Sequence, residues 1–316
     1  MEAASTAAVS GGRPEAPSLR AARRRWGESI IKGFLVLAAL ISLLTTTGIV
    51  YALLEETVVF FRQVPIGDFL FGTKWTPLFQ SGSFGVLPLV AGTFATTAIA
   101  LVVAIPLGLG AAVYLSEYSR PRVRKVVKPT LELLAGIPTI VFGYFALTFF
   151  TPDILRGFFN LHVGIFNALA AGIIIGFLII PIVASISEDS MRSVPQALRE
   201  GAFGLGASKL QVTVRVVFPA ALSGIVASVV LAMSRAVGET MVVLIAGGQQ
   251  PQWGIDVGQS METLTAFIAA TAKGDVPTGS VEYKTLFAVG MTLFVITLVI
   301  NMISIRFVRK YRQIYE

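Results

Sequence analysis

The chain has 316 residues, of which 54% are hydrophobic and only 14% are charged, and its formal net charge is +7. Ordinary soluble domains carry about 25% charged residues, so this composition excludes that class and indicates a protein built for lipid. Cysteine is absent and His162 is the only histidine, which excludes a disulfide framework and a Cys/His metal cluster but leaves an all-carboxylate metal site open. The apolar runs are continuous rather than alternating, which favours a helix bundle over a barrel.

Residues 1–29 are rich in Ala, Ser, Gly, Pro and Arg, which predicts a disordered basic cytoplasmic tail. The apolar stretch from Ile30 to Leu54 is too long for a signal peptide and has no evident cleavage site, so we interpret it as a retained first span. Five more runs predict spans at about 86–116, 129–151, 164–187, 218–245 and 285–306. Glycines within them, such as Gly108, Gly172 and Gly176, indicate close helix approach. We expect an all-α membrane protein with about six transmembrane helices, formed by residues 30–316.

Basic residues are unevenly distributed between the predicted loops. With the tail in the cytoplasm, the cytoplasmic segments hold 19 of the 25 Lys and Arg residues, the outside segments hold 5, and Arg235 lies within a span (19 + 5 + 1 = 25). Because cytoplasmic loops carry an excess of Lys and Arg, this bias predicts that both termini are cytoplasmic. Two long outside loops, about 55–85 and 246–284, could form interfacial helices or a docking surface for an extracellular partner.

The predicted cytoplasmic loop 188–217 contains two helix starts separated by a turn. Two pairs have capping-box spacing, and two glycines lie between them: Ser193/Gln196, Ser208/Gln211, Gly204 and Gly206. We expect a short helix over about 194–204, a glycine turn, and a second helix that begins near 209 and runs toward the fifth span. These signals alone are equally consistent with an ordinary surface helix pair.

The residues of this loop resemble the coupling motif of ABC importer permeases, written E-A-A, three residues, G, nine residues, I, one residue, L-P. The matching positions, three of them conservative departures, are Glu200, Gly201, Ala202, Gly206, Val216, Phe218 and Pro219. The resemblance implies that the short helix docks in a cleft on a separate cytoplasmic ATPase. The small Ala202 would then allow close packing, while Arg199 and Glu200 would form ion pairs with the ATPase at the rim of the contact.

Arg235 and Glu239 lie in the middle of the apolar run 218–245, where ionisable side chains are costly. Four residues apart, they project from nearly the same helix face and can neutralise each other or face a water-filled pathway. A guanidinium offers a planar fork of donors to an oxyanion, and a nearby carboxylate can hold it until an anion displaces it. Ser234 and Thr240 add hydroxyl groups close by. A salt bridge that only orients the bundle is the alternative.

The segment Arg235-Ala-Val-Gly-Glu239-Thr240 resembles the R-A-x-G-E-T segment of phosphate-importer permeases, the PstC and PstA family. Two further stretches, Phe69–Pro77 and Leu133–Pro138, resemble PstC rather than PstA. The resemblance implies a permease subunit of the phosphate ABC importer, with a type I permease-like bundle in the bacterial inner membrane. It implies as partners a second, PstA-like permease, two copies of a PstB-like ATPase and an extracytoplasmic PstS-like phosphate-binding protein.

Carried over by position, the pathway residues would be Arg235, Glu239, Thr240 and Ser234, and the coupling residues Arg199, Glu200, Gly201, Ala202, Gly206 and Pro219. The sequence has no P-loop, so ATP hydrolysis is expected in a partner, and no cofactor is expected.

A permease for sulfate or molybdate is the main alternative, because Arg235 does not distinguish tetrahedral anions. A membrane-embedded enzyme would need a nucleophile with a base or a metal cluster, and His162 stands alone. A passive anion channel would have no use for an ATPase-docking motif, and the positive-inside distribution explains the net charge without nucleic acid.

Overall fold

The computed structural model describes residues 26–77, 79, 82–274 and 276–311. Within these residues all regular structure is helical, apart from one isolated bridge between Trp75 and Phe84. The prediction of an all-α protein is therefore confirmed. The chain divides into two compact units, Met1–Tyr51 and Ala52–Glu316. Most of the predicted tail, residues 1–25, lies outside the described residues, and the first helix begins at Trp26, within the last residues of that tail.

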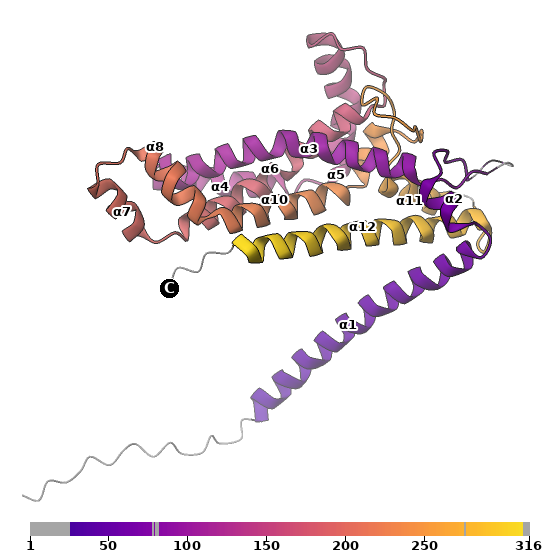
Figure 1. Cartoon of the computed structure of the whole chain (residues 1–316), viewed down its shortest axis with the longest axis horizontal. Helices are drawn as coiled ribbons and strands as arrows, with labels where there is room; N and C mark the ends of the chain where they lie inside the picture. The colour runs from indigo at the N-terminus through magenta and orange to yellow at the C-terminus, as the bar shows by residue number, and fades with distance from the viewer. Residues whose placement is uncertain (1–25, 78, 80–81, 275, 312–316) are drawn as a thin grey trace, which may run out of the picture. The chain divides into compact units, whose positions relative to one another are not determined.

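Figure 1 shows the helices along the chain. They are α1 (Trp26–Phe61), α2 (Ile66–Phe71), α3 (Leu87–Val113), α4 (Pro121–Leu134), α5 (Thr139–Phe145), α6 (Ala168–Arg192), α7 (Gln196–Gly204), α8 (Lys209–Val212), α9 (Phe218–Ala220), α10 (Leu222–Val237), α11 (Leu264–Lys273) and α12 (Val281–Tyr311). Four π-helical stretches continue or follow them: η1 (Tyr114–Tyr118), η2 (Ala146–Phe158), η3 (Thr213–Val217) and η4 (Val243–Gly247). The two long outside loops of the prediction contain α2 and α11.

Six spans are present only if two bent helix pairs are each counted as one. Four single helices are long and apolar enough to cross a membrane, at Gly27–Phe61, Leu87–Tyr118, Ala168–Arg192 and Val281–Arg306. The expected third span bends by 84° between α4 and α5–η2, and the expected fifth bends by 70° between α8–α9 and α10. Pro138 and Pro219 lie at or near these breaks, where a missing N–H and the ring sterics interrupt a helix. The expectation of about six transmembrane helices therefore holds when each bent pair is counted as one span.

The core of the larger unit is built on the close packing of α3 against α6. Gly172 and Gly176 lie one turn apart on α6, and a Cβ at either position would come within 2.8 Å of Ile99 or Val103 on α3. In the reverse direction, a Cβ at Gly108 of α3 would lie 2.7 Å from Val183 of α6. Small residues let two backbones approach and gain van der Waals contact where lipid offers no hydrophobic drive between helices. The prediction of close approach at these glycines is confirmed.

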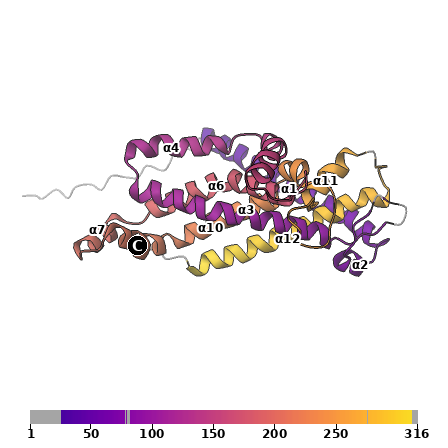
Figure 2. The same ribbon diagram turned by 90° about the horizontal axis from the view of Figure 1, so that it is seen from above.

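The two ends of this unit carry different elements. Figures 1 and 2 place α7 and α8 at one end and α2 and α11 at the other. The α11 end has an aromatic cluster in which Phe60, Phe69, Trp75 and Phe267 meet edge to face. The α7 end instead packs aliphatic side chains, among them Met191, Val212 and Val217. The predicted pathway residues lie on α10 and just after it. The predicted coupling residues lie on α7 and in the segments that follow it.

Candidate functional site

Arg235 and Glu239 form an ion pair in the structure, with Arg235 Nη1 at 2.7 Å from Glu239 Oε2. Helix α10 ends at Val237, so Glu239 lies just beyond the helix and not within a continuous span as expected. Its other oxygen, Oε1, accepts the backbone N–H groups of Met241 (3.2 Å) and Val242 (3.4 Å). The carboxylate is therefore stabilised from two sides, by a guanidinium and by the start of the next helical stretch.

The two members of the pair differ in exposure. The Glu239 side chain is 1% exposed, whereas the Arg235 side chain is 40% exposed. Among the described residues, Glu239 is the only hydrogen-bond partner of this guanidinium, which keeps further N–H groups available. A planar donor fork that is partly accessible and held by one carboxylate can bind an oxyanion. This geometry is what anion recognition needs, and it also neutralises both charges in the absence of an anion.

The hydroxyl groups of Ser234 and Thr240 do not join the guanidinium. Ser234 Oγ donates to Asn301 Oδ1 of α12 at 3.0 Å, and Thr240 Oγ1 donates to the carbonyl of Gly238 at 3.2 Å. The backbone of Glu239 is instead held from α11, because Thr265 Oγ1 donates to its carbonyl oxygen at 2.7 Å. Sequence reasoning missed Asn301 and Thr265, which lie far along the chain from the segment that they support.

The predicted coupling segment folds as α7, a turn and α8. The second capping box is present, since Ser208 N donates to Gln211 Oε1 at 2.8 Å and Gln211 N to Ser208 Oγ at 3.4 Å. The first is wrong: Ser193 Oγ donates to the carbonyl of Ser190, and α7 begins after Pro195 without a side-chain cap. Gly206 has a φ of +80°, which lets the turn reverse at a conformation that disfavours side chains.

The residues of α7 face two ways. Glu200 and Gly201 are exposed, while Ala202 packs against the chain's own cluster at this end. Arg199 is turned inward: it donates to the carbonyls of Val194 (2.6 Å) and Met191 (2.7 Å) and lies 3.3 Å from Glu117. Its side chain is 12% exposed, and these contacts fix α7 onto the end of α6. The rim ion pair of Arg199 with a partner stays a prediction.

Two further positions of the motif are accessible at this end, Gly206 and Pro219. Apolar side chains on and after α7 are exposed beside them: Leu198 (37%), Phe203 (46%), Leu205 (91%) and Leu210 (63%). We call these four residues the α7 apolar patch. An exposed apolar patch of this kind marks an interaction surface.

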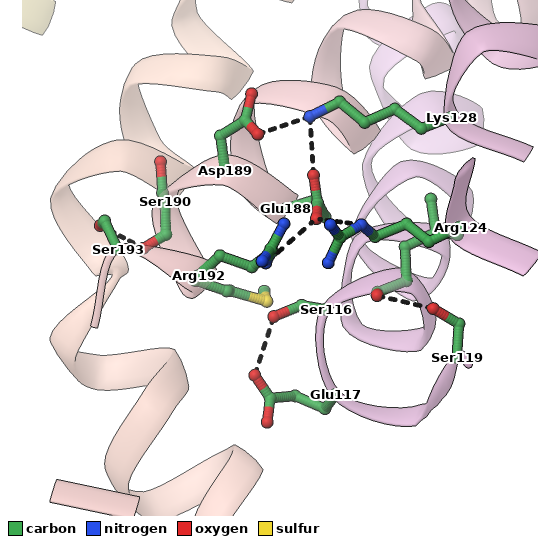
Figure 3. Close-up of polar contacts among 12 residues, drawn as sticks. Ser116, Glu117, Ser119, Arg124, Lys128, Glu188, Asp189, Ser190, Arg192 and Ser193 are labelled. Atoms are coloured by element: carbon green, nitrogen blue, oxygen red, sulfur yellow. Dashed lines mark hydrogen bonds and ion pairs between the residues drawn. The ribbon is translucent and has the colours of Figure 1, made fainter. Parts of the chain in front are cut away.

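A buried charge cluster around Glu188, drawn in Figure 3, ties α4 to α6 next to α7. The Glu188 side chain is 1% exposed; Lys128 Nζ lies 2.7 Å from Oε2, and Arg124 Nε and Arg192 Nε lie 3.7 and 3.8 Å from Oε1. Lys128 also bonds Asp189. In the sequence these three cations contribute only to the excess of Lys and Arg in the predicted cytoplasmic loops. The acidic pair at the end of a span was the available signal, but its partners on α4 lie about 60 residues earlier.

No group of three or more His, Cys, Asp or Glu residues lies in position to hold a metal ion within the part of the chain that the structure describes.

The chain is similar to known proteins over most of its length. Residues 104–313 match the family described as Binding-protein-dependent transport system inner membrane component. The probable ABC transporter permease protein YqgH of Bacillus subtilis is 35% identical over 247 residues, which cover 78% of this chain and 79% of that protein. The phosphate transport system permease protein PstC of Haemophilus influenzae is 30% identical over 308 residues, covering 91% and 95%. PstC of Mesorhizobium japonicum is 35% identical over 257 residues, covering 75% and 76%.

Two solved structures have the same fold at low sequence identity. A chain of the bacterial alginate ABC transporter, in complex with its alginate-bound periplasmic protein, matches with a TM-score of 0.63 and 17% identity over 92% of this chain and 99% of that one. A chain of the inward-facing methionine ABC transporter MetNI matches with a TM-score of 0.53 and 20% identity over 72% and 95%. With the family match over residues 104–313, these findings establish that the chain belongs to the binding-protein-dependent transport system inner membrane component family.

Proposed function

We propose that this protein is the permease subunit of an ATP-driven importer that moves inorganic phosphate into the cell. The observation that carries the proposal is the Arg235–Glu239 pair, a partly exposed guanidinium held by a buried carboxylate near the middle of the bundle. The relatives named as phosphate transport permeases support phosphate as the substrate.

The geometry explains how Arg235 can bind an anion without leaving Glu239 uncompensated. When phosphate takes the guanidinium, the carboxylate still accepts the N–H groups of Met241 and Val242. These two backbone donors continue to satisfy one carboxylate oxygen by hydrogen bonding. Arg235 can therefore exchange between Glu239 and a passing phosphate ion.

The proposed assembly follows the family. Both termini lie in the cytoplasm, and α7 with its apolar patch docks on a separate ATPase that hydrolyses ATP, present in two PstB-like copies. A second, PstA-like permease completes the pathway, so that Arg235 faces the interface between the two. A PstS-like binding protein delivers phosphate at the α11 end. Sulfate or molybdate is the alternative substrate.

The first test is uptake of labelled phosphate into proteoliposomes that hold the assembled complex, with ATP on the ATPase side and sulfate as competitor. Arg235→Gln should reduce uptake at least about 100-fold, because an intramembrane arginine that binds a dianion contributes several kcal/mol. Arg156→Gln is the matched control, since this exposed arginine bonds only the carbonyl of Val163. If the complex takes up sulfate and phosphate does not compete with that uptake, the phosphate assignment is wrong but the protein is still an importer subunit.

A charge swap separates an anion site from a purely structural salt bridge. In the double variant Arg235→Glu with Glu239→Arg, the ion pair is restored with reversed polarity. We expect assembly comparable to wild type but no phosphate uptake, because the accessible group is then a carboxylate. Normal uptake by the swapped variant would show that the pair only orients the bundle.

A further inference from the structure

A small cavity at the α11 end has polar groups without a hydrogen-bond partner among the residues that the structure describes. It has a volume of about 250 Å3 and lies between the segment after α2, the segment after η4, and α11. Its walls include Trp75, Phe79, Gln249, Glu262, Phe267 and Thr271. Phe79 is 71% exposed and marks the open rim, whereas Trp75, Glu262, Phe267 and Thr271 are buried and form the floor.

Glu262 is the charged group of this cavity. It is 6% exposed, and its carboxyl has no hydrogen bond or ion pair within the described part of the chain. Its backbone N–H donates to the carbonyl oxygen of Gln250 at 3.3 Å. Its backbone carbonyl packs against Gly92 of α3, so closely that a Cβ at Gly92 would lie 2.3 Å from the carbonyl oxygen. The next residue but one is bonded as well, since Leu264 N donates to Thr93 Oγ1. The backbone of this segment is therefore held against α3.

Trp75 supplies the second unsatisfied group. Its side chain is buried, and within the described ranges the Nε1–H has no acceptor. The ring is held edge to face against Phe267 at 4.9 Å and against Phe69 at 6.2 Å between centroids. A buried donor without a partner loses the hydrogen bonds it made to water, so unpaired indole groups are rare unless a ligand completes them.

The chemistry of the cavity selects its occupant. Small-molecule pockets usually measure about 300–1,000 Å3, so this one fits a single long side chain better than a free ligand. A carboxyl without a counter-ion, beneath the aromatic rings of Trp75, Phe79 and Phe267, favours a cation. The indole N–H requires an acceptor, which a peptide carbonyl provides. No other titratable side chain lines the cavity among the described residues.

We propose that this cavity receives a lysine or arginine side chain of the extracytoplasmic binding protein, with Glu262 as its counter-ion and Trp75 Nε1–H bonded to a backbone carbonyl of the same segment. The inference rests on the proposed import function, which places the α11 end outside the cell. It gives a docking role to the Trp75 segment.

Helix α11 connects the cavity to the Arg235–Glu239 pair. Helix α11 provides Phe267 and Thr271 to the cavity, and the same helix holds the backbone of Glu239 through Thr265. An occupant of the cavity therefore contacts the element that supports the pathway carboxylate.

The test measures binding of the purified phosphate-binding protein to the full transporter complex in lipid nanodiscs. At pH 8, Glu262→Gln should weaken binding at least about tenfold and Trp75→Phe about three- to tenfold, as for a buried ion pair and a single hydrogen bond. Glu282→Gln is the matched control, because this carboxylate lies in the first turn of α12, outside the cavity. A double-mutant cycle with each Lys and Arg on the contact face of the binding protein should identify one cation that couples to Glu262.

The pH dependence of binding distinguishes a counter-ion from a residue that only supports the fold, because only a counter-ion must lose its proton when the cation binds. Burial raises the pKa of Glu262 to about 8, so a cation must displace a proton when it binds below that pH. Wild-type affinity should rise by up to about tenfold per pH unit between pH 6 and pH 8, and the Glu262→Gln variant should lack that component. Lys74 and Lys273, the cations next in sequence to the lining segments, are exposed and outside the cavity.

The two proposals can fail separately. If the wild-type complex imports phosphate but Glu262→Gln binds the binding protein with wild-type affinity, or no cation couples to Glu262, the docking inference is wrong and the import function stands. If free lysine or sodium competes with the binding protein only in the presence of Glu262, the site binds small cations and the inference is also overturned. A complex that takes up no phosphate would overturn the proposed function itself.

Discussion

Glu188, Glu239 and Glu262 are all buried, with 1%, 2% and 6% exposure, but their surroundings differ. Glu188 is surrounded by three cations, and Glu239 has one guanidinium and two backbone N–H groups. Glu262 has neither within the described residues. Burial without a compensating cation or donor disfavours the ionised form of a carboxyl and so raises its pKa. For Glu262 burial raises the pKa to about 8, so a cationic partner would change its charge on binding.

The proton on Glu262 predicts how stability depends on pH. Burial raises its pKa from 4.5 to about 8, so between these values the folded protein binds a proton that the unfolded chain has lost. Stability from this group is therefore fully present below about pH 4.5 and is lost as the pH rises to about 8, by up to about 1.4 kcal/mol per pH unit. Thermal unfolding of the complex between pH 5 and 9 should show a decline that Glu262→Gln removes. Parallel curves for the two proteins would contradict the assigned burial.

At this scale the sequence predicts partners that are close along the chain. The spacing of Arg235 and Glu239 indicated their ion pair correctly, because four residues bring two side chains together near any helix end. The burial of Glu262 could not be predicted, since its aromatic cover comes from Trp75 and Phe267 on separate elements. The intrachain contacts of Arg199 could not be predicted for a similar reason: its acceptors are the backbone carbonyls of Met191 and Val194, which carry no sequence signal.

At the scale of elements, the contact between α3 and α6 depends on glycine. Gly176→Ala places a Cβ 2.8 Å from Val103 and 3.0 Å from the carbonyl of Ala100, so the helices must separate. We expect destabilisation by about 1–3 kcal/mol, as in other overpacked cores. Gly110→Ala is the control on α3, because no atom lies within 4 Å of its Cβ and alanine favours helix by up to about 1 kcal/mol. Thermal unfolding of both variants in detergent gives the comparison; equal midpoints would show that α3 and α6 are not packed this closely.

The sequence predicted where the apolar helices lie but not which way they run. Hydropathy reports length and composition, and all six expected runs contain helix in the structure. The bends of 84° and 70° depend on how tertiary packing resolves a Gly or Pro near a helix break, and the same residue types elsewhere leave a helix unbroken. Pro106 and Pro181 lie inside α3 and α6 without ending them. Composition alone therefore gives candidate hinges without their angles.

At the scale of the whole molecule, the two ends of the larger unit present different chemistry to their partners. The α11 end offers a cavity in which the Glu262 carboxyl and the Trp75 Nε1–H have no partner among the described residues. The α7 end offers the α7 apolar patch, anchored by Arg199 and supported from below by the Glu188 cluster. A protruding apolar end suits a cleft on a second protein, and a recessed polar cavity suits a protruding side chain.

The α7 apolar patch predicts which end holds the ATPase. Leu205 is 91% exposed at the turn after α7, and burying a leucine against a partner contributes about 1.5–3 kcal/mol. Leu205→Ser should therefore weaken binding of the ATPase subunit at least about tenfold in a pull-down titration. Ile255→Ser is the matched control, because Ile255 is 84% exposed but lies in the segment between η4 and α11. It should leave ATPase binding unchanged. If both variants lost the ATPase equally, exposed apolar area in general and not the α7 end would hold the subunits together, and the orientation of the chain would have to be assigned anew.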